Sequence, residues 1–324
     1  MFEDSPVSKD IFKFFNFKYG QVVAPIGLLK CCSVVSNQLE YPRLNLWVVA
    51  PTRQYKTQTS KEVQRIFHEK YWIDVGSDFT IHGLYEEYGE DVDGKTFLVN
   101  DATVLFSSKS ARTKERLVGA LAELLSDEKY EYKDFAHQWT IRGKCTAIVN
   151  QTAESFNYYK NKLEYSTVLE RFLVCHYRLT LEEQRESRAF VLRKFKPQIT
   201  VEEIKPRNIM NLGKYDDAIK EYAMDYSALS LRAYNSCKDV IIATLKSHAI
   251  LNGRNHVTLD DLYLIRMIRD YLKDPYVPND PTIIECLRQD RSYKDICLLL
   301  NKKPSYKTHI SKVARKAKER GLID

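Results

Sequence analysis

The sequence predicts an α/β protein with a parallel-sheet core, a helical region after it and a small C-terminal helical unit. Three observations support this fold class. An apolar run of strand type at residues 44–50 breaks into a polar loop that ends in Lys56-Thr57. Further strand-type runs alternate with helical segments after it, a pattern typical of a parallel sheet. Residues 301–324 carry eight Lys and Arg against two acids, which is most of the net charge of +7.

The composition is that of a globular, intracellular protein. Of 324 residues, 44% are hydrophobic, which is ample for the cores of two or three domains. The seven cysteines are odd in number and show no Cys-x-x-Cys spacing, which argues against a disulfide framework and a zinc site. Since no apolar stretch approaches the roughly 18 residues of a membrane span, we expect a cytoplasmic location and no membrane partner.

The polar loop after the first strand has the outline of a phosphate-binding loop. In the pattern G-x-x-x-x-G-K-[ST], glycines let backbone N–H groups close on phosphates, the Lys reaches the β and γ oxygens, and the hydroxyl holds Mg²⁺. Lys56 and Thr57 match the last two positions, but Ala50 and Tyr55 occupy the glycine positions. We expect Tyr55 to obstruct and strain the loop, because Gly is used where φ is positive. Taken alone, Lys-Thr after a strand is also compatible with chance.

Two later strand-type runs end in polar side chains. Asn100-Asp101 follows the run at 96–99, and Asn150 follows the run at 145–149. Carboxylates at the carboxyl end of such strands hold Mg²⁺ and orient the attacking water. The candidate metal residues are therefore Thr57 and Asp101, while the neutral amide of Asn100 is a poorer partner. We expect Asn150 to face the γ-phosphate.

The core is predicted to span residues 1–200, followed by a helical lid at 201–273 and a proline-spaced linker at 274–281. Within the core, apolar spacing predicts helices at about 21–37, from the loop to about 68, at 113–126 and at 182–188, and strands at 71–75 and 173–177. A separate unit at 282–324 fits three short helices, at 282–288, 292–300 and 305–320.

The last of these helices divides into two faces. Apolar side chains fall on one face, and Thr308, Ser311, Lys312, Arg315 and Lys316 lie largely on the other. Helix-turn-helix units dock such a helix in a DNA groove, with Lys and Arg on phosphates and a few side chains on base edges. The candidate DNA-binding residues are Lys302, Lys303, Lys307, Thr308, Lys312, Arg315 and Lys316. The alternative is a solvated, Lys-rich helix without a partner.

In this order, the motifs resemble those of the AAA+ ATPases and, within them, the MCM-type replicative helicases, over about residues 20–324. Residues 45–57 are similar to the family's phosphate loop and residues 94–101 to its Walker B motif. Asn150 lies where the family has its sensor 1 asparagine. Glu170-Arg171-Phe172 resembles the arginine finger, and Leu231-Arg232-Ala233-Tyr234 resembles the lid, which makes Arg232 a sensor 2 candidate. Individually, Arg171 and Arg232 are equally compatible with surface ion pairs.

The resemblance implies an AAA+ parallel-sheet P-loop core, a helical lid and a C-terminal helix-turn-helix domain of the winged type. It also implies ATP and Mg²⁺ as cofactors, DNA as a partner and assembly into a ring. The candidate catalytic residues are then Asn100, Asp101, Asn150, Arg171 and Arg232, and the nucleotide-binding residues are Lys56 and Thr57.

Three functions remain open. The first is an MCM-like AAA+ protein that binds DNA in replication or DNA maintenance with impaired or absent ATP hydrolysis, which Tyr55 and Asn100 favour. The second is an active DNA-dependent ATPase or helicase that works as a ring, in which Arg171 reaches a neighbouring subunit's phosphate. The third is a helix-turn-helix transcription regulator, which rests only on residues 282–324.

Overall fold

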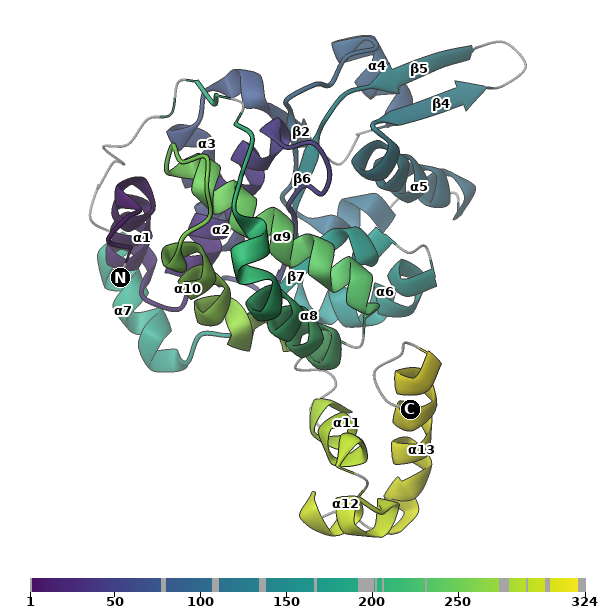
Figure 1. The fold of residues 1–324 in the computed structure, drawn as a ribbon. Coiled ribbons are helices and arrows are strands. Elements are labelled where there is room, and N and C mark those ends of the chain that lie inside the picture. The colour runs from purple at the N-terminus through teal and green to yellow at the C-terminus, as the bar shows by residue number, and fades with distance from the viewer. Residues whose placement is uncertain are drawn as a thin grey trace.

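The computed structural model describes residues 2–76, 80–106, 111–133, 138–165, 168–191, 201, 203–205, 207–230, 232–273, 280–289, 291–300 and 304–319. In this part of the chain the protein is α/β, with a five-stranded parallel sheet in the order β2-β3-β6-β1-β7 (Figure 1). The strands are β1 (Asn45–Ala50), β2 (Trp72–Val75), β3 (Thr96–Val99), β6 (Thr146–Thr152) and β7 (Phe172–His176). The strands expected near these positions from the sequence are confirmed.

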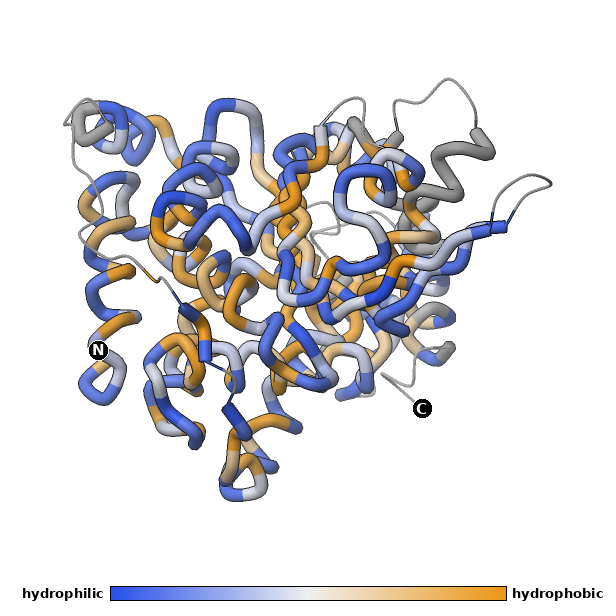
Figure 2. Tube along the Cα trace, turned by 90° about the horizontal axis from the view of Figure 1, so that it is seen from above, coloured by the Kyte–Doolittle hydropathy of each residue, from blue (hydrophilic) through white to orange (hydrophobic). Residues whose placement is uncertain are grey.

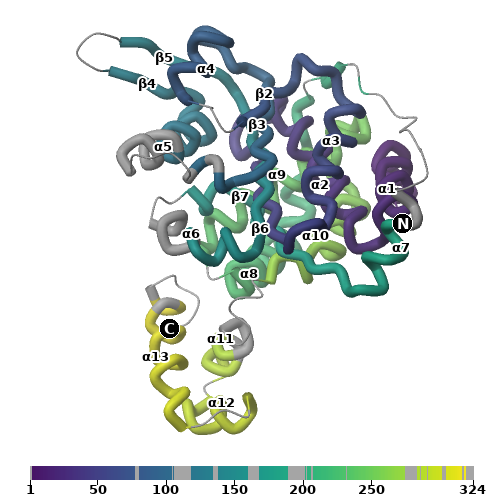
Figure 3. The backbone as a smooth tube through the Cα atoms, turned by 180° about the vertical axis from the view of Figure 1, so that it is seen from behind, coloured from purple at the N-terminus to yellow at the C-terminus, as the bar shows by residue number. Residues whose placement is uncertain are grey.

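Both faces of the sheet are buried under helices. In β1, Leu46 and Val48 belong to one apolar cluster and Trp47 and Val49 to another, because successive side chains of a strand point to opposite faces. Apolar residues therefore concentrate in the interior of the molecule (Figure 2). The first cluster includes residues of α1 (Pro6–Tyr19), α2 (Ala24–Val35) and α3 (Lys56–Ile66), and the second includes residues of α4 (Ile81–Tyr88), α5 (Ala111–Asp127) and α6 (Ala153–Tyr165). Figure 3 shows these two groups of helices on opposite sides of the sheet.

The connections after β1 and β6 diverge. These strands are parallel neighbours, with Leu46 opposite Ile148 and Ala50 opposite Thr152. The helix after β1 is α3, which packs on one face, and the helix after β6 is α6, which packs on the other. In open α/β sheets, such a divergence leaves a crevice at the carboxyl ends of the strands, and ligands bind there.

A β-hairpin between α5 and β6 was not predicted from the sequence. Its strands are β4 (Lys129–Lys133) and β5 (Gln138–Arg142), which pair antiparallel and project from the body of the molecule (Figure 1). The ring of Trp139 is stacked between Tyr85 of α4, at 4.8 Å, and Tyr132 of β4, at 4.6 Å. Because Tyr85 lies far from the hairpin in sequence, the local pattern of charged and aromatic residues did not reveal this packing.

The helical region after the sheet contains α7 (Leu181–Val191), α8 (Asp216–Ser230), α9 (Tyr234–Leu251) and α10 (Leu259–Ile268). The expectation that residues 201–272 are helical holds for the described residues from Leu212 onward, except for the connections at 232–233 and 252–258. The described residues between 201 and 211 are irregular, apart from isolated bridges of Val201 to Phe67 and of Met210 to His256. No helix within the described ranges is long and apolar enough to cross a membrane.

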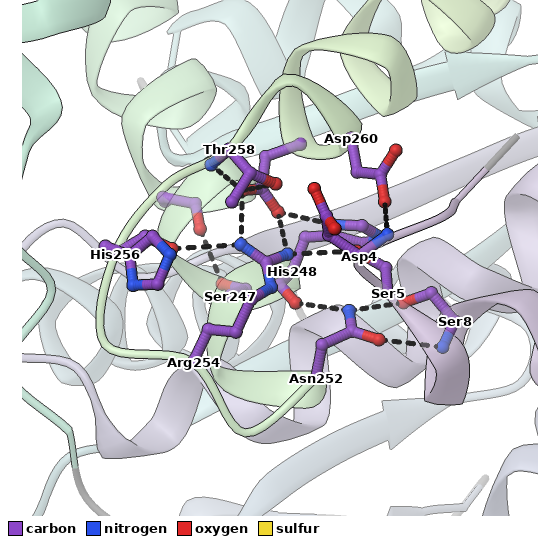
Figure 4. Close-up of polar contacts among 12 residues, drawn as sticks. Asp4, Ser5, Ser8, Ser247, His248, Asn252, Arg254, His256, Thr258 and Asp260 are labelled. Atoms are coloured by element: carbon purple, nitrogen blue, oxygen red, sulfur yellow. Dashed lines mark hydrogen bonds and ion pairs between the residues drawn. The ribbon is translucent and has the colours of Figure 1, made fainter.

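A buried polar network joins α9 to α10 (Figure 4). His248 Nδ1 lies 2.5 Å from Asp261 Oδ1, and both side chains are fully buried. Arg254 donates to both carboxylate oxygens of Asp261, at 2.8 and 2.9 Å, and the carboxylate also accepts the backbone N–H of Thr258. Burial disfavours the charged carboxylate, but the hydrogen bonds from His248 and Arg254 outweigh it and hold the pKa of Asp261 below its usual range.

The N-terminal segment is bound to the same region. Ser8 N–H donates to Asn252 Oδ1 at 3.0 Å, and Asn252 Nδ2 donates to the Ser8 hydroxyl at 2.7 Å (Figure 4). Asp4 N–H donates to Asp260 Oδ2 at 2.9 Å. The chain's first helix is thereby attached to the connection between α9 and α10.

The C-terminal unit contains α11 (Asp280–Arg288), α12 (Tyr293–Leu299) and α13 (Lys307–Glu319), which confirms the three expected helices. It has its own apolar core, and α11 lies against α8 (Figure 1). In α13, Ile310, Val313 and Ala317 are buried, whereas Thr308, Lys312 and Arg315 are exposed, so the predicted division into two faces is confirmed. Lys302, Lys303 and the linker at 274–279 lie outside the described residues, as does the side chain of Lys316.

Candidate phosphate-binding site

The loop between β1 and α3 lies at the crevice where the connections diverge. Two residues of this loop, which contains no glycine, have positive φ: Arg53 at 60° and Tyr55 at 63°. Tyr55 is the N-cap of α3 and adopts the left-handed conformation, with ψ of 9°. The expected backbone strain at the second glycine position is therefore present, and it costs an L-residue about 1–2 kcal/mol. Strain of this kind persists where the surrounding structure enforces it, often at functional sites.

The ring of Tyr55 differs from the expectation. Instead of standing free in the loop, it is 7% exposed and packs in the apolar cluster, with its centroid 5.3 Å from that of Tyr19 in α1. The reason is that Tyr19 and its neighbours offer the ring an apolar environment, which is more favourable than exposure to water. The ring is accommodated by the fold, and the strain is confined to the backbone.

The N-terminus of α3 is uncapped. The backbone N–H groups of Lys56, Thr57 and Gln58 lie in the first turn, so they have no intrahelical acceptor. Among the described residues, no side chain caps them either. Such an end attracts anions, because the N–H groups and the helix dipole both present positive charge. The preceding Gln54 fixes the loop: its carbonyl accepts from the Tyr177 hydroxyl, and its side chain accepts from Leu179 N–H at 2.8 Å.

Lys56 lies inside this loop. Its Nζ donates to the carbonyl oxygens of Ala50 and Pro51, at 2.7 Å each. Burial lowers the pKa of Lys56 to about 8, and the negative charges of Glu154 and Asp101 partly oppose that shift. An ammonium has three donors, so two bonds to the loop leave the third for a ligand. Glu154, in the first turn of α6, was not anticipated from the sequence.

A second lysine, also not anticipated, lies beneath the loop. Lys30 of α2 is fully buried, and its Nζ is within 2.7–2.9 Å of the Lys56 carbonyl oxygen, Thr59 Oγ1, Ser60 Oγ and Asn150 Oδ1. The only available signal was a single charged residue within the largely apolar run at 26–35. Burial, together with the positive charge of Lys56, holds the pKa of Lys30 well below its ordinary value.

Asn150 is engaged in the interior. Its side chain is fully buried within β6, accepts from Lys30 and donates from Nδ2 to Ser60 Oγ at 3.0 Å. Nδ2 also lies 3.5 Å from Asn100 Oδ1. Lys30 and Ser60 thus bond both polar atoms of the Asn150 side chain, and its expected approach to a γ-phosphate stays a prediction.

The two candidate metal residues lie on the accessible side of the site. Thr57 is half-buried, and Asp101 is exposed, with Oδ1 accepting the Thr103 N–H at 3.0 Å. Within the described ranges, no group of three or more His, Cys, Asp and Glu is placed to hold a metal ion by itself.

The two candidate arginines lie near the amino ends of the strands, whereas the loop lies at the carboxyl ends. Phe172, at the start of β7, pairs with Asn45 at the start of β1, so Arg171 stands at the amino end of the strands. Its Nε donates to Ser126 Oγ, and it lines a cavity of about 300 Å³ with Glu170 and Asp239. Arg232 is buried and donates to the Tyr226 hydroxyl at 2.7 Å and to the Phe172 carbonyl. The structure thus brings Lys56, Thr57, Asn100, Asp101 and Asn150 together and leaves Arg171 and Arg232 apart from them.

A cavity of about 340 Å³ lies close to the loop on the side of α1 and α7. Tyr19, Leu179 and Tyr271 line it, together with Glu183 and Glu186. Two of these residues also contact the loop, since Tyr19 packs against Tyr55 and Leu179 bonds Gln54. The loop is therefore in direct contact with the lining of the cavity.

Comparison with known proteins finds no family model that matches this chain and no curated protein that matches it. The functional conclusion consequently depends on the geometry of the site.

Proposed function

We propose that this chain binds a nucleoside triphosphate at the N-terminus of α3 and acts as an MCM-like AAA+ protein that binds DNA, in replication or DNA maintenance, with impaired or absent hydrolysis. One observation supports the ligand class above all others. An uncapped helix N-terminus, a loop held in a left-handed turn and a buried lysine meet at the crevice beside the carboxyl ends of β1 and β6.

The residues present fit the phosphates and a magnesium ion. The N–H groups at the start of α3 and the third donor of Lys56 suit phosphate oxygens. Magnesium is commonly held by one or two carboxylates together with substrate phosphates, so the carboxylate of Asp101 and the hydroxyl of Thr57 would suit the ion. The ion would neutralise phosphate charge there. The neighbouring cavity of about 340 Å³ offers room for a base and ribose.

Hydrolysis is the weak part of this site. Asn100 stands where an acid would orient the attacking water, and its neutral amide cannot accept a proton. Arg171 lies at the amino ends of the strands, away from the loop, so it can act only on a ligand bound by another copy of the chain. The active-ring alternative depends on that contact.

A titration with a fluorescent ATP analogue tests the binding site. Lys56→Ala should weaken binding about tenfold or more, because it removes the ligand's cationic partner. Lys61→Ala is the matched control, an exposed lysine of the same helix that should bind as the wild type does. Equal affinity of all three proteins would reject the site. Sustained phosphate release by the wild type would instead favour the active ATPase.

DNA binding by α13 is the second part of the proposal. Its exposed face carries Lys307, Thr308, Lys312 and Arg315 over a buried apolar side. Removing one side chain that binds a phosphate should reduce the salt slope of DNA binding by about one. Removing one that binds a base edge should cost about 1–3 kcal/mol.

We therefore expect Arg315→Ala to lower affinity and flatten any sequence preference, and Lys312→Ala to lower affinity. Lys220→Ala, at an exposed lysine of α8, is the control. If both α13 variants lose the same affinity for every DNA sequence, the helix binds DNA only through its positive charge. A nucleotide-independent footprint at one DNA sequence would favour the transcription regulator.

A further inference from the structure

Lys30 is a buried lysine without a carboxylate partner among the described residues. Its Nζ is surrounded by four oxygens, which belong to a backbone carbonyl, two hydroxyls and the amide of Asn150. Buried lysines are ordinarily paired with an acid. Lys18, also buried on the same side of the sheet, shows that usual arrangement, with Nζ 2.6 Å from Glu62.

The oxygens around Lys30 can satisfy either protonation state. As an ammonium, Nζ donates to the Lys56 carbonyl, to Asn150 Oδ1 and to one hydroxyl. As an amine, it donates twice and accepts the hydroxyl proton of Ser60, whose oxygen in turn accepts from Asn150 Nδ2 at 3.0 Å. The pocket therefore stays hydrogen-bonded whether or not Lys30 carries a charge.

The main charge that acts on Lys30 is the positive charge of Lys56. From α3, Lys56 presents a positive charge, and from the described residues of β6 only the neutral Asn150 is in contact. On α2 itself, the neighbouring thiol of Cys31 is buried, and burial raises its pKa, so it stays neutral. Asp261 of α10 faces Cys32, whereas Asp101 and Glu154 act on Lys56. A new negative charge at the loop would thus be the largest change in the field at Lys30.

We infer that Lys30 is a positioning residue that takes up a proton from solvent when a phosphate occupies the loop, and that it transmits this occupancy through Asn150 to Asn100. The inference rests on the proposed function. A phosphate at the N-terminus of α3 offsets the charge of Lys56 and favours the ammonium form of Lys30. The ammonium then holds Asn150 Oδ1 more strongly, since charge-assisted hydrogen bonds are the stronger ones.

Calorimetric titration with ATPγS, in two buffers of different ionisation enthalpy at about neutral pH, measures the protons taken up on binding. The wild type should take up more protons than Lys30→Met, by up to about one per ligand. Proton changes on the ligand are common to both proteins and cancel in the comparison. Lys18→Met is the matched control: it removes a buried lysine that already has a carboxylate partner, and its uptake should equal that of the wild type.

Equal uptake by the wild type and Lys30→Met would overturn the role of Lys30 and leave the nucleotide site standing. Absence of binding by the wild type would overturn the proposed function and, with it, this inference. If Lys30→Met fails to fold, the ¹⁵Nζ resonance of Lys30 in the wild type decides. It should move from the amine toward the ammonium position when ATPγS is added, and an unchanged resonance would overturn the proposal.

Discussion

Asp261 and Lys30 are both fully buried ionisable side chains, and the protein stabilises them in different ways. Around Asp261, a carboxylate meets His248 and the guanidinium of Arg254. Around Lys30, an amine meets neutral oxygens of the described residues and lies near a charge of its own sign. The first network is compensated within itself, so ligands elsewhere have little effect on it. The second is balanced by dipoles, so its charge state responds to what binds at the loop.

The largest effect is expected when the compensated network is broken. Asp261→Ala should lower the free energy of unfolding by about 3–5 kcal/mol, because it leaves the fully buried His248 and the half-buried Arg254 without their carboxylate. Asp260→Ala is the control, since Asp260 is exposed and accepts the N–H of Asp4. Urea unfolding at neutral pH measures both. Similar midpoints for the two variants would mean that the buried network is not what holds α9 to α10.

The same network gives a pH dependence of known sign. Because the pKa of Asp261 is lower in the folded protein, its contribution is present above the unfolded value of about 3.9 and is lost as pH falls through the folded value. Asp261→Ala should therefore show a shallower loss of stability in acid than the wild type. Parallel stability curves from pH-dependent unfolding would contradict the assignment.

A smaller loss of stability is expected for a change at the amino ends of the strands. Arg232→Ala removes hydrogen bonds to the Phe172 carbonyl and the Tyr226 hydroxyl, so the free energy of unfolding should fall by about 1.5–3 kcal/mol. Nucleotide affinity should stay at the wild-type value, because Arg232 does not reach the loop. A drop in nucleotide affinity without loss of stability would instead support the sensor 2 role of Arg232.

The last effect is expected at Lys30, where it appears as a slope of the free energy of unfolding against pH. A lysine whose pKa is lower in the folded state binds fewer protons there than in the unfolded chain, so wild-type stability rises with pH up to the ordinary lysine pKa of about 10.4. Lys30→Met lacks this term. The wild type should therefore gain stability relative to the variant between about pH 7 and 10, by up to about 1.4 kcal/mol per pH unit. A constant difference across that range would show that Lys30 is charged throughout.

Local sequence pattern was sufficient for much of the framework. The apolar runs before Lys56, Asn100 and Asn150 specify buried strands, and parallel pairing brings the ends of such strands to one edge. The alternation of Ile310 and Val313 with exposed cations likewise specifies the two faces of α13. These features depend on residues within a few positions of one another, so periodicity reveals them.

Tertiary packing alone decided the rest of the site. Lys30 reaches Asn150 across 120 positions of sequence, and no periodicity links the two. The ring of Tyr55 is buried because α1 brings Tyr19 to it, and Arg232 is directed away from the loop because Tyr226 and Phe172 bond its guanidinium. Each of these outcomes depends on which helix covers which face of the sheet. The sequence by itself determined that a strand, a loop and a helix would meet at Lys56, whereas the packing of α1 and α2 determined how the charges there are held.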